Sequence, residues 1–326
     1  MKAIKSLKRK IGVTLNNSIL FSILNKLNLV VFHWDSRAHQ VHFGNSDPDK
    51  KYMCIRPMDN TQGLLSIYFY VLNNVKWAIE NDYIPYVDFE SEKCQYFTGR
   101  IINGTKNAWE YYFKQPSLLN KDDIYTKKCV LMSGWSFNPK YKIHQITKEV
   151  NSLRSEPIKN ISKLIGVKED IYKIVDEKKQ HLFNGSVLGV FMRGTDYVKM
   201  KPKGHAVQPS LEQVLNKVDE FLGKYHIDRI FVVTEDFDYY SALKEKYGNL
   251  IFCSDDYFVR GYEGENYIES SFDNDPYERG LNYIVRVLLL NECDYLITGI
   301  TNGSLVSCCL NDKIYKDEYW FRLGDY

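Results

Sequence analysis

The stretch VLGVFMRGTDYVKMKPKGHAVQP, residues 187–209, decides the fold of this chain. It begins as a run of apolar residues typical of a buried strand and then changes abruptly to charged, glycine and hydroxyl residues. Ligands of open parallel sheets bind beyond the carboxyl ends of the strands. Arg193 offers a planar fork of donors for phosphate oxygens, Gly194 permits close backbone approach, and Thr195 adds a hydroxyl. The stretch predicts an anion-binding strand end, with an ion pair between Arg193 and Asp196 as the structural alternative.

Strand and helix patterns alternate on both sides of this stretch. Residues 210–225 have the spacing of an amphipathic helix, with Ser210 as N-cap and Gln213 at the capping-box position. Further strands are predicted at residues 51–57, 82–90, 129–135, 229–236, 249–256 and 294–304, and further helices at 63–81, 238–248, 280–293 and 304–310. The alternation predicts an α/β protein with two Rossmann-like domains and a ligand cleft between them.

Polar side chains also follow two other predicted strands. Glu235 and Asp236 come after one of them. Thr301, Asn302 and Ser304 come after the last. Acidic groups suit ribose hydroxyls, base amines or a proton acceptor, and small hydroxyl residues before a helix suit phosphates. Since neither stretch is a G-x-G-x-x-G or Walker loop, a nicotinamide dehydrogenase or P-loop kinase is disfavoured.

The composition is that of a soluble globular protein long enough for two domains. The 326 residues are 44% apolar and 26% charged, with a net charge of +2. A chain so nearly neutral has no overall attraction to nucleic acid, which is not expected as a partner. The seven cysteines are odd in number and lack C-x-x-C spacing, which indicates reduced core thiols in a cytosolic protein.

The N-terminus is basic and amphipathic. Its apolar runs are interrupted at Asn25, Lys26 and Asn28, so they are too short to span a membrane, and a signal-peptide cleavage site is not evident. Residues 1–45 are therefore predicted to be a basic amphipathic leader, either a solvated helix packed on its own domain or, as the alternative, a segment that rests on an anionic membrane surface. The predicted location is cytoplasmic, with a peripheral position on the inner face of the membrane as the alternative that the leader allows.

The motifs FMRGTDY, GHAVQPSLEQVLNKVDE, IFVVTED and NECDYLITGITNGSLVSCCL, in this order, resemble the donor-binding half of the alpha-1,6-fucosyltransferases and the related nodulation and protein O-fucosyltransferases. The first half resembles them at TQGLLSIYFYVLNNVKWAIENDYIPYVD and NAWEYYFKQP. The resemblance implies a GT-B-like fold, GDP-fucose as donor, inversion at the sugar and no divalent metal. It also implies acceptor-side roles for Gly63, Asn107, Trp109 and Glu110.

The resemblance assigns donor-site roles residue by residue. Arg193 takes the place of the arginine that binds the beta-phosphate, and His205 matches a family histidine. Asp294 matches an aspartate that contacts the guanine. The acidic pair at 235–236 and the small polar loop at 301–304 match segments at the donor and its phosphates.

Three departures from the family pattern leave the catalytic base open. Lys201 stands where the alpha-1,6 enzymes carry a glutamate proposed as the base, and a lysine cannot take that role at its usual pKa. Tyr197 replaces a lysine of the family pattern. Phe191 stands where relatives often have a histidine, so recognition of the nucleotide's base, as distinct from the catalytic base, can differ. Asp196 is the first candidate for the base, followed by the pair at 235–236.

With this resemblance, the chain is expected to be an inverting glycosyltransferase that needs no cofactor or metal and transfers fucose from GDP-fucose to a hydroxyl of a glycan, in a surface polysaccharide or a lipid-linked oligosaccharide. Residues 46–180 are predicted as the acceptor domain with a helical connector, and residues 181–326 as the donor domain. Arg193 would stabilise the departing diphosphate. The alternatives are a transferase for another nucleotide sugar, an inactive nucleotide-sugar or glycan-binding protein, and a membrane-associated scaffold.

Overall fold

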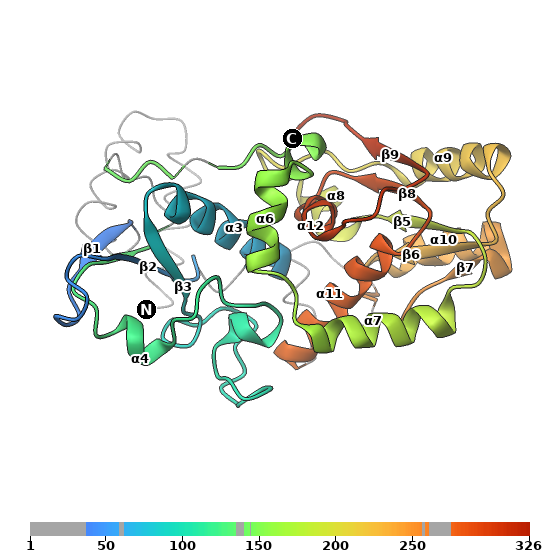
Figure 1. Ribbon diagram of the computed structural model, residues 1–326. Coiled ribbons are helices and arrows are strands. Elements are labelled where there is room, and N and C mark those ends of the chain that lie inside the picture. The colour runs from blue at the N-terminus through green and yellow to red at the C-terminus, as the bar shows by residue number, and fades with distance from the viewer. Residues whose placement is uncertain (1–36, 59–61, 135–139, 144, 256–257, 261–274) are drawn as a thin grey trace, which may run out of the picture.

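The computed structural model describes residues 37–58, 62–134, 140–143, 145–255, 258–260 and 275–326, with the backbone alone at residues 195–196 (Figure 1). Its strands form two separate sheets. The first contains β1 (His39–Val41), β2 (Lys51–Ile55), β3 (Tyr83–Val87) and β4 (Val130–Met132), in the order β1-β4-β2-β3. Within it, β2 runs parallel to β3 and β4, whereas β1 is antiparallel to β4.

The second sheet is parallel throughout. It contains β5 (Val187–Phe191), β6 (Arg229–Val233), β7 (Ile251–Phe252), β8 (Tyr295–Gly299) and β9 (Asp317–Phe321), in the order β7-β6-β5-β8-β9. The chain moves outward from β5 through β6 to β7 and then returns to the other side of β5. In doubly wound folds a ligand crevice opens where the strand order reverses in this way, which here is between β5 and β8.

Helices connect these strands. They are α3 (Leu64–Glu80), α4 (Lys121–Ile124), α5 (Val150–Leu153), α6 (Glu156–Leu164), α7 (Glu169–Leu182), α8 (Thr195–Met200), α9 (Leu211–Lys224), α10 (Phe237–Tyr247), α11 (Pro276–Asn291) and α12 (Asn302–Leu310), with short 3-10 turns at Ala108–Tyr111 and Gly248–Leu250. The capping box predicted for α9 is present, because Ser210 accepts from the Gln213 amide and Gln213 accepts from the Ser210 amide. The predicted α/β class with parallel sheets is confirmed.

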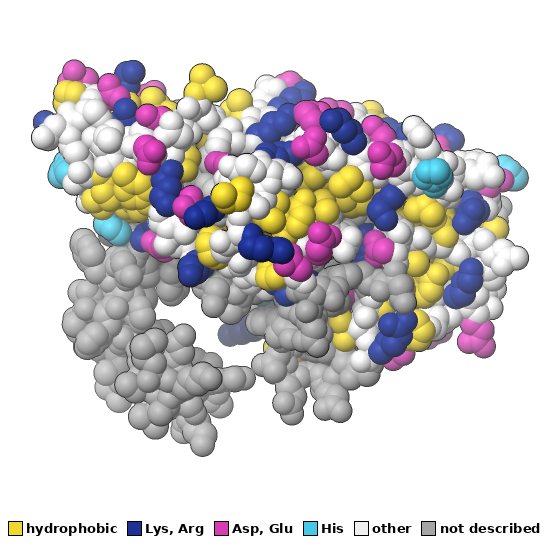
Figure 2. Space-filling model, turned by 90° about the horizontal axis from the view of Figure 1, so that it is seen from below, with side chains coloured by type: hydrophobic (Ala, Val, Ile, Leu, Met, Phe, Trp, Pro, Cys, Tyr) yellow, Lys and Arg dark blue, Asp and Glu magenta, His cyan; other side chains and the backbone are white. Residues whose placement is uncertain are grey.

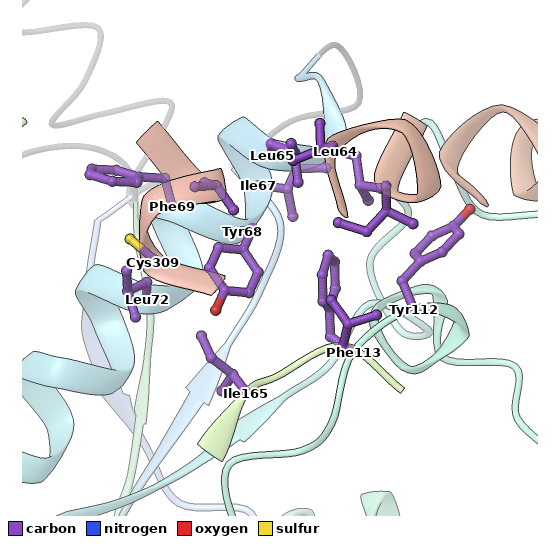
Figure 3. Close-up of a cluster of buried hydrophobic side chains, with 14 of the residues drawn as sticks. Leu64, Leu65, Ile67, Tyr68, Phe69, Leu72, Tyr112, Phe113, Ile165 and Cys309 are labelled. Carbon is purple, nitrogen blue, oxygen red and sulfur yellow. The ribbon is translucent and has the colours of Figure 1, made fainter. Parts of the chain in front are cut away.

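One continuous apolar core joins the two sheets. Helix α3 is buried along most of its length and contacts β2 and β3 on one side and α11 and α12 on the other. Figure 3 shows side chains of α3, among them Tyr68 and Leu72, close to Cys309 of α12 and to Ile165. Because large apolar interfaces restrict domain motion, α3 fixes the position of the first sheet relative to the second.

The predicted domain limits differ from the structure at two places. Residues 39–41 belong to the first sheet as β1, although they fall within the predicted leader 1–45. The helical connector was assigned to the first domain, but α7 contacts α11 of the second half, and α6 contacts both α12 of the second half and α3 of the first (Figure 1). Residues 1–36, which carry the basic segment, lie outside the described residues, and the membrane role stays a prediction.

The cysteines and the surface agree with a reduced globular protein. All seven thiols are free and five are buried, and burial raises the pKa of Cys309 to about 12. On the described part of the face in Figure 2, acidic and basic side chains are interspersed, so charge of one sign is not concentrated there. None of the described helices is long and apolar enough to cross a membrane.

Candidate functional site

The carboxyl end of β5 carries an ion pair. The Nε atom of Arg193 lies 3.1 Å from Oε1 of Glu235, which follows β6, and each side chain is only 14% exposed. The strands β5 and β6 are neighbours, so their ends bring the two residues together. Arg193 was predicted to face a ligand or to pair with Asp196. The structure gives it Glu235 as a carboxylate partner, while the side chain of Asp196 is not described.

Tyr197 and His205 extend this cluster. The guanidinium of Arg193 lies over the Tyr197 ring, 4.7 Å from its centroid, and the Tyr197 hydroxyl lies 3.1 Å from Nδ1 of His205. His205 is held by the chain end, since its carbonyl accepts from the Tyr326 amide. Tyr197, which replaces a lysine of the family pattern, thus contacts both Arg193 and His205. This link was not predicted from the sequence.

The amino end of α12 follows β8 at the same edge. Thr301 caps the helix by accepting from the Ser304 amide at 3.1 Å, and Ser304 is buried with its hydroxyl donating to the Gly299 carbonyl. The side-chain Nδ2 of Asn302 donates to Oγ of Ser66 in α3 at 2.8 Å. The predicted loop is therefore largely structural at Thr301 and Ser304, whereas Asn302 reaches the first domain.

Gly194 and Asp236 fit closely together. A Cβ built on Gly194 would lie 2.6 Å from Oδ2 of Asp236, so a glycine is required at this position for the present packing. Oδ1 of Asp236 accepts from the amides of Asp238 and Tyr239 and caps α10. These contacts give Asp236 a structural function at the strand end. Thr195 begins α8, and its side chain is not described.

Asp294 lies at the opposite edge of the sheet from Arg193. It precedes β8, accepts from the Val187 amide at 3.0 Å and pairs with Lys316 at 2.8 Å, all at the amino ends of the strands. A carboxylate there cannot share one ligand with Arg193 at the carboxyl edge. Burial tends to raise the pKa of Asp294, but the Lys316 and Val187 contacts outweigh it and lower the pKa below the ordinary value.

We expect Asp294→Asn to lower the free energy of unfolding at pH 7 by about 1 kcal/mol and to leave nucleotide binding unchanged. A carboxyl whose pKa is lowered by folding adds stability above its unfolded pKa of roughly 4 and loses it as the pH falls through the folded pKa. Urea denaturation at pH 7 and at about pH 3 should therefore show a smaller difference between the variant and the wild type in acid. If this variant lost GDP binding, the result would support the predicted contact between Asp294 and the guanine.

The predicted acceptor-side residues after β3 are core residues. Trp109 is 1% exposed, donates through Nε1 to the Lys114 carbonyl and packs on Phe113, with ring centroids 4.5 Å apart. Asn107 is also buried, and it bonds to the backbone of Phe89 and Val87.

Glu110 and Gly63, the other two predicted acceptor-side residues, have structural contacts of their own. Glu110 accepts from Gln115 at 2.6 Å and from Thr105 at 2.8 Å. Gly63 is the N-cap of α3. The rings of this segment are buried in the core, and the acceptor-side roles that the resemblance implies for Asn107, Trp109 and Glu110 stay predictions.

A cavity of about 370 Å³ lies where the carboxyl edges of the two sheets meet. Met58, after β2, and Gly134, after β4, line it from the first sheet, and Asn302 lines it from the second. Several polar residues of α3 form its wall. The described lining thus comes mainly from the first half of the chain, and Asn302 is its contribution from the second half.

A second charged pair lies near the end of β6 and escaped sequence reasoning. Arg286 is buried in α11, and its Nε donates to Oδ1 of Asp255 at 2.9 Å. Its Nη1 donates to the Thr234 carbonyl at 3.4 Å. A single arginine inside the apolar run NYIVRVLLLN was the signal that could have found it. Among the described residues, no group of three or more His, Cys, Asp or Glu side chains is arranged to hold a metal ion.

Comparison with known proteins supports the fold. No family model and no curated protein matches the chain. The structure of POFUT1 in complex with GDP-fucose matches with a TM-score of 0.50 and 10% identity, over 86% of this chain and 99% of that one. The chain has the fold of this fucosyltransferase. NodZ alpha-1,6-fucosyltransferase soaked with GDP-fucose matches with a TM-score of 0.46 and 14% identity, over 80% of this chain and 93% of that one. NodZ from Bradyrhizobium gives the same TM-score and identity over 79% of this chain.

Proposed function

We propose that this protein is an inverting, metal-independent glycosyltransferase that transfers fucose from GDP-fucose to a hydroxyl of a glycan. The observation that carries the proposal is that Arg193 follows β5 and the amino end of α12 follows β8, which are neighbouring strands at the point where the strand order reverses. An arginine and a helix amino end at such a crevice favour a diphosphate. The shared fold with POFUT1, which was solved with GDP-fucose, supports the nucleotide sugar as donor.

The chemistry requires displacement at the anomeric carbon. The acceptor hydroxyl oxygen forms a bond to that carbon as the bond to the diphosphate oxygen breaks on the opposite face. The diphosphate departs with the electron pair, and the hydroxyl proton passes to a base. Positive charge at the diphosphate lowers the barrier because negative charge develops there. Arg193 is the residue we assign to this role.

We assign the base to Asp196 before Glu235. Glu235 is engaged with the guanidinium of Arg193, and Asp236 caps α10, so each carboxylate already has a partner. Asp196 belongs to α8, which begins directly after the arginine and Gly194. Replacement of Asp196 by asparagine should therefore reduce turnover more than binding of GDP.

Thermal stabilisation by GDP, UDP, CDP and ADP, each with and without magnesium, tests the donor. We expect GDP alone to raise the melting temperature and magnesium to leave the effect unchanged; a ligand at 100 times its Kd stabilises by about 2.7 kcal/mol. Preference for another nucleotide would support the alternative donor, which the Phe191 departure motivates. GDP binding without turnover on any glycan would support an inactive binding protein, and no response to any nucleotide would contradict the proposal.

The acceptor and the location remain part of this proposal. A glycan under construction on a surface polysaccharide or a lipid-linked oligosaccharide would place the enzyme at the cytoplasmic face of the membrane. Flotation of the full chain with vesicles of anionic or of neutral lipid tests the basic residues 1–36. Equal flotation with both lipids, or none, would contradict a charge-driven membrane contact and the scaffold alternative.

A further inference from the structure

The cavity between the sheets has the chemistry of a saccharide subsite. We propose that its wall on α3 binds a neutral, hydroxyl-bearing ring, which is the acceptor glycan if the proposed function is correct. The assignment rests on the polar residues Gln62, Ser66, Tyr70 and Asn74, which line the cavity from one helix and its N-terminal approach. None of them was predicted from the sequence as a site residue.

Asn74 provides the observation that points to a ligand. It is 1% exposed and lies in the cavity wall. Its amide nitrogen donates to the Tyr70 carbonyl at 2.8 Å, but its Oδ1 atom is buried with no hydrogen-bond partner among the described residues. A buried acceptor without a donor is costly, and native structures rarely keep one without a ligand or water to satisfy it.

Gln62 repeats the same feature at the other end of the wall. Its Oε1 atom is also buried and has no hydrogen-bond partner among the described residues. Two residues that line one cavity thus each have an amide oxygen that needs a hydrogen donor. Phosphate oxygens at neutral pH accept but do not donate, so they cannot meet this need, whereas sugar hydroxyls donate and accept.

The rest of the lining suits a neutral ring. Lys148 is the single charged residue among the described lining residues, and no carboxylate is present there. Its side chain is exposed as a whole, although loss of hydration lowers the pKa of its ammonium against the raising effect of Asp325. Phe69, Tyr70 and Tyr141 add aromatic surface on which the apolar face of a sugar can pack.

The position of the cavity fits an acceptor. It lies beyond the carboxyl ends of β2 and β4, between which the strand order of the first sheet reverses. Asn302, the first residue of α12, lines the same cavity, and its side chain donates a hydrogen bond to Ser66. The helix amino end that we assign to the donor diphosphate is therefore next to the saccharide subsite. A volume of about 370 Å³ is at the lower end of the range of roughly 300–1,000 Å³ for small-molecule sites.

Saturation-transfer NMR and titration with methyl glycosides of glucose, galactose, mannose and N-acetylglucosamine test the subsite. We expect at least one glycoside to bind the full chain, and Asn74→Leu and Gln62→Met each to weaken it by about two- to tenfold, the range for loss of one neutral hydrogen bond. Asn81→Leu is the matched control, because Asn81 makes the same bond to the carbonyl four residues earlier at the exposed end of α3. That control should bind like the wild type.

The test of the saccharide subsite can fail or succeed independently of the test of GDP binding. GDP stabilisation that persists in both variants, together with weakened glycoside binding, separates the subsite from the donor site. Should Asn74→Leu fail to fold, Gln62→Met still decides the question, since Gln62 precedes α3 and is only partly buried. Unchanged glycoside affinity in the folded variants would mean that water satisfies these oxygens and would overturn the proposal, as would binding of no glycoside.

Discussion

We expect Arg193→Ala to abolish measurable stabilisation by GDP and to lower turnover by about a hundred- to a thousandfold, the range for removal of one preorganised donor from a developing oxyanion. The physical reason is that the guanidinium lies, 14% exposed, at the carboxyl end of β5, where the developing charge of the diphosphate would meet a desolvated donor. Calorimetric titration with GDP measures the binding effect, and a turnover assay with GDP-fucose measures the catalytic one.

Two further variants separate this effect from a loss of structure. Removing Arg193 leaves Glu235 nearly buried without its cation, which by itself destabilises the strand end. In Arg193→Gln combined with Glu235→Gln, the pair is neutral, so the fold should recover while GDP binding does not. Arg322→Ala removes an exposed arginine paired with Glu149 and should leave both properties unchanged. A folded Arg193→Ala protein with wild-type GDP affinity would refute the donor-site assignment.

The strand ends could be predicted from the sequence because period and composition determine them locally. The apolar run before Arg193 and the capping box at Ser210 both depend on residues only a few positions apart, and both occur as predicted. In contrast, β9 (Asp317–Phe321) pairs with a strand some twenty residues earlier, and its sequence DEYWF begins with two acidic residues and buries only Phe321, so it lacks the apolar run of a buried strand.

The site was harder to predict because it depends on which edge of a sheet a residue occupies. Glu235 and Asp294 are both acidic residues beside strands, but one follows β6 and the other precedes β8, so they lie at opposite edges. The strands predicted at 229–236 and 294–304 already place these two residues at opposite strand ends, but the resemblance assigned both of them to the donor site. The α3 wall was missed for another reason: Asn74 lies in the helical run YVLNNVKW, which indicates a buried helix but not that an amide oxygen would lack a partner.

Trp109→Ala should lower the free energy of unfolding by about 3–5 kcal/mol, the usual cost of truncating a buried aromatic side chain. The indole is 1% exposed, lies near Tyr68 and Phe89, and packs on Phe113, so its removal opens a cavity under α3 and breaks the bond to the Lys114 carbonyl. Chemical denaturation of the variant and the wild type measures the change.

The same variant decides between a core and an acceptor role for the segment at 107–116. Leu118→Ala, which truncates a fully exposed apolar side chain, is the control and should shift stability by less than about 0.5 kcal/mol. Trp109→Phe keeps most of the ring volume and should recover part of the loss. If Trp109→Ala kept wild-type stability but raised the KM for a glycan, the indole would be a stacking surface after all. Because α3 carries both the packing against Trp109 and the polar wall of the cavity, we expect the destabilised variant to weaken glycoside binding as well, whereas Arg193→Ala leaves that binding intact.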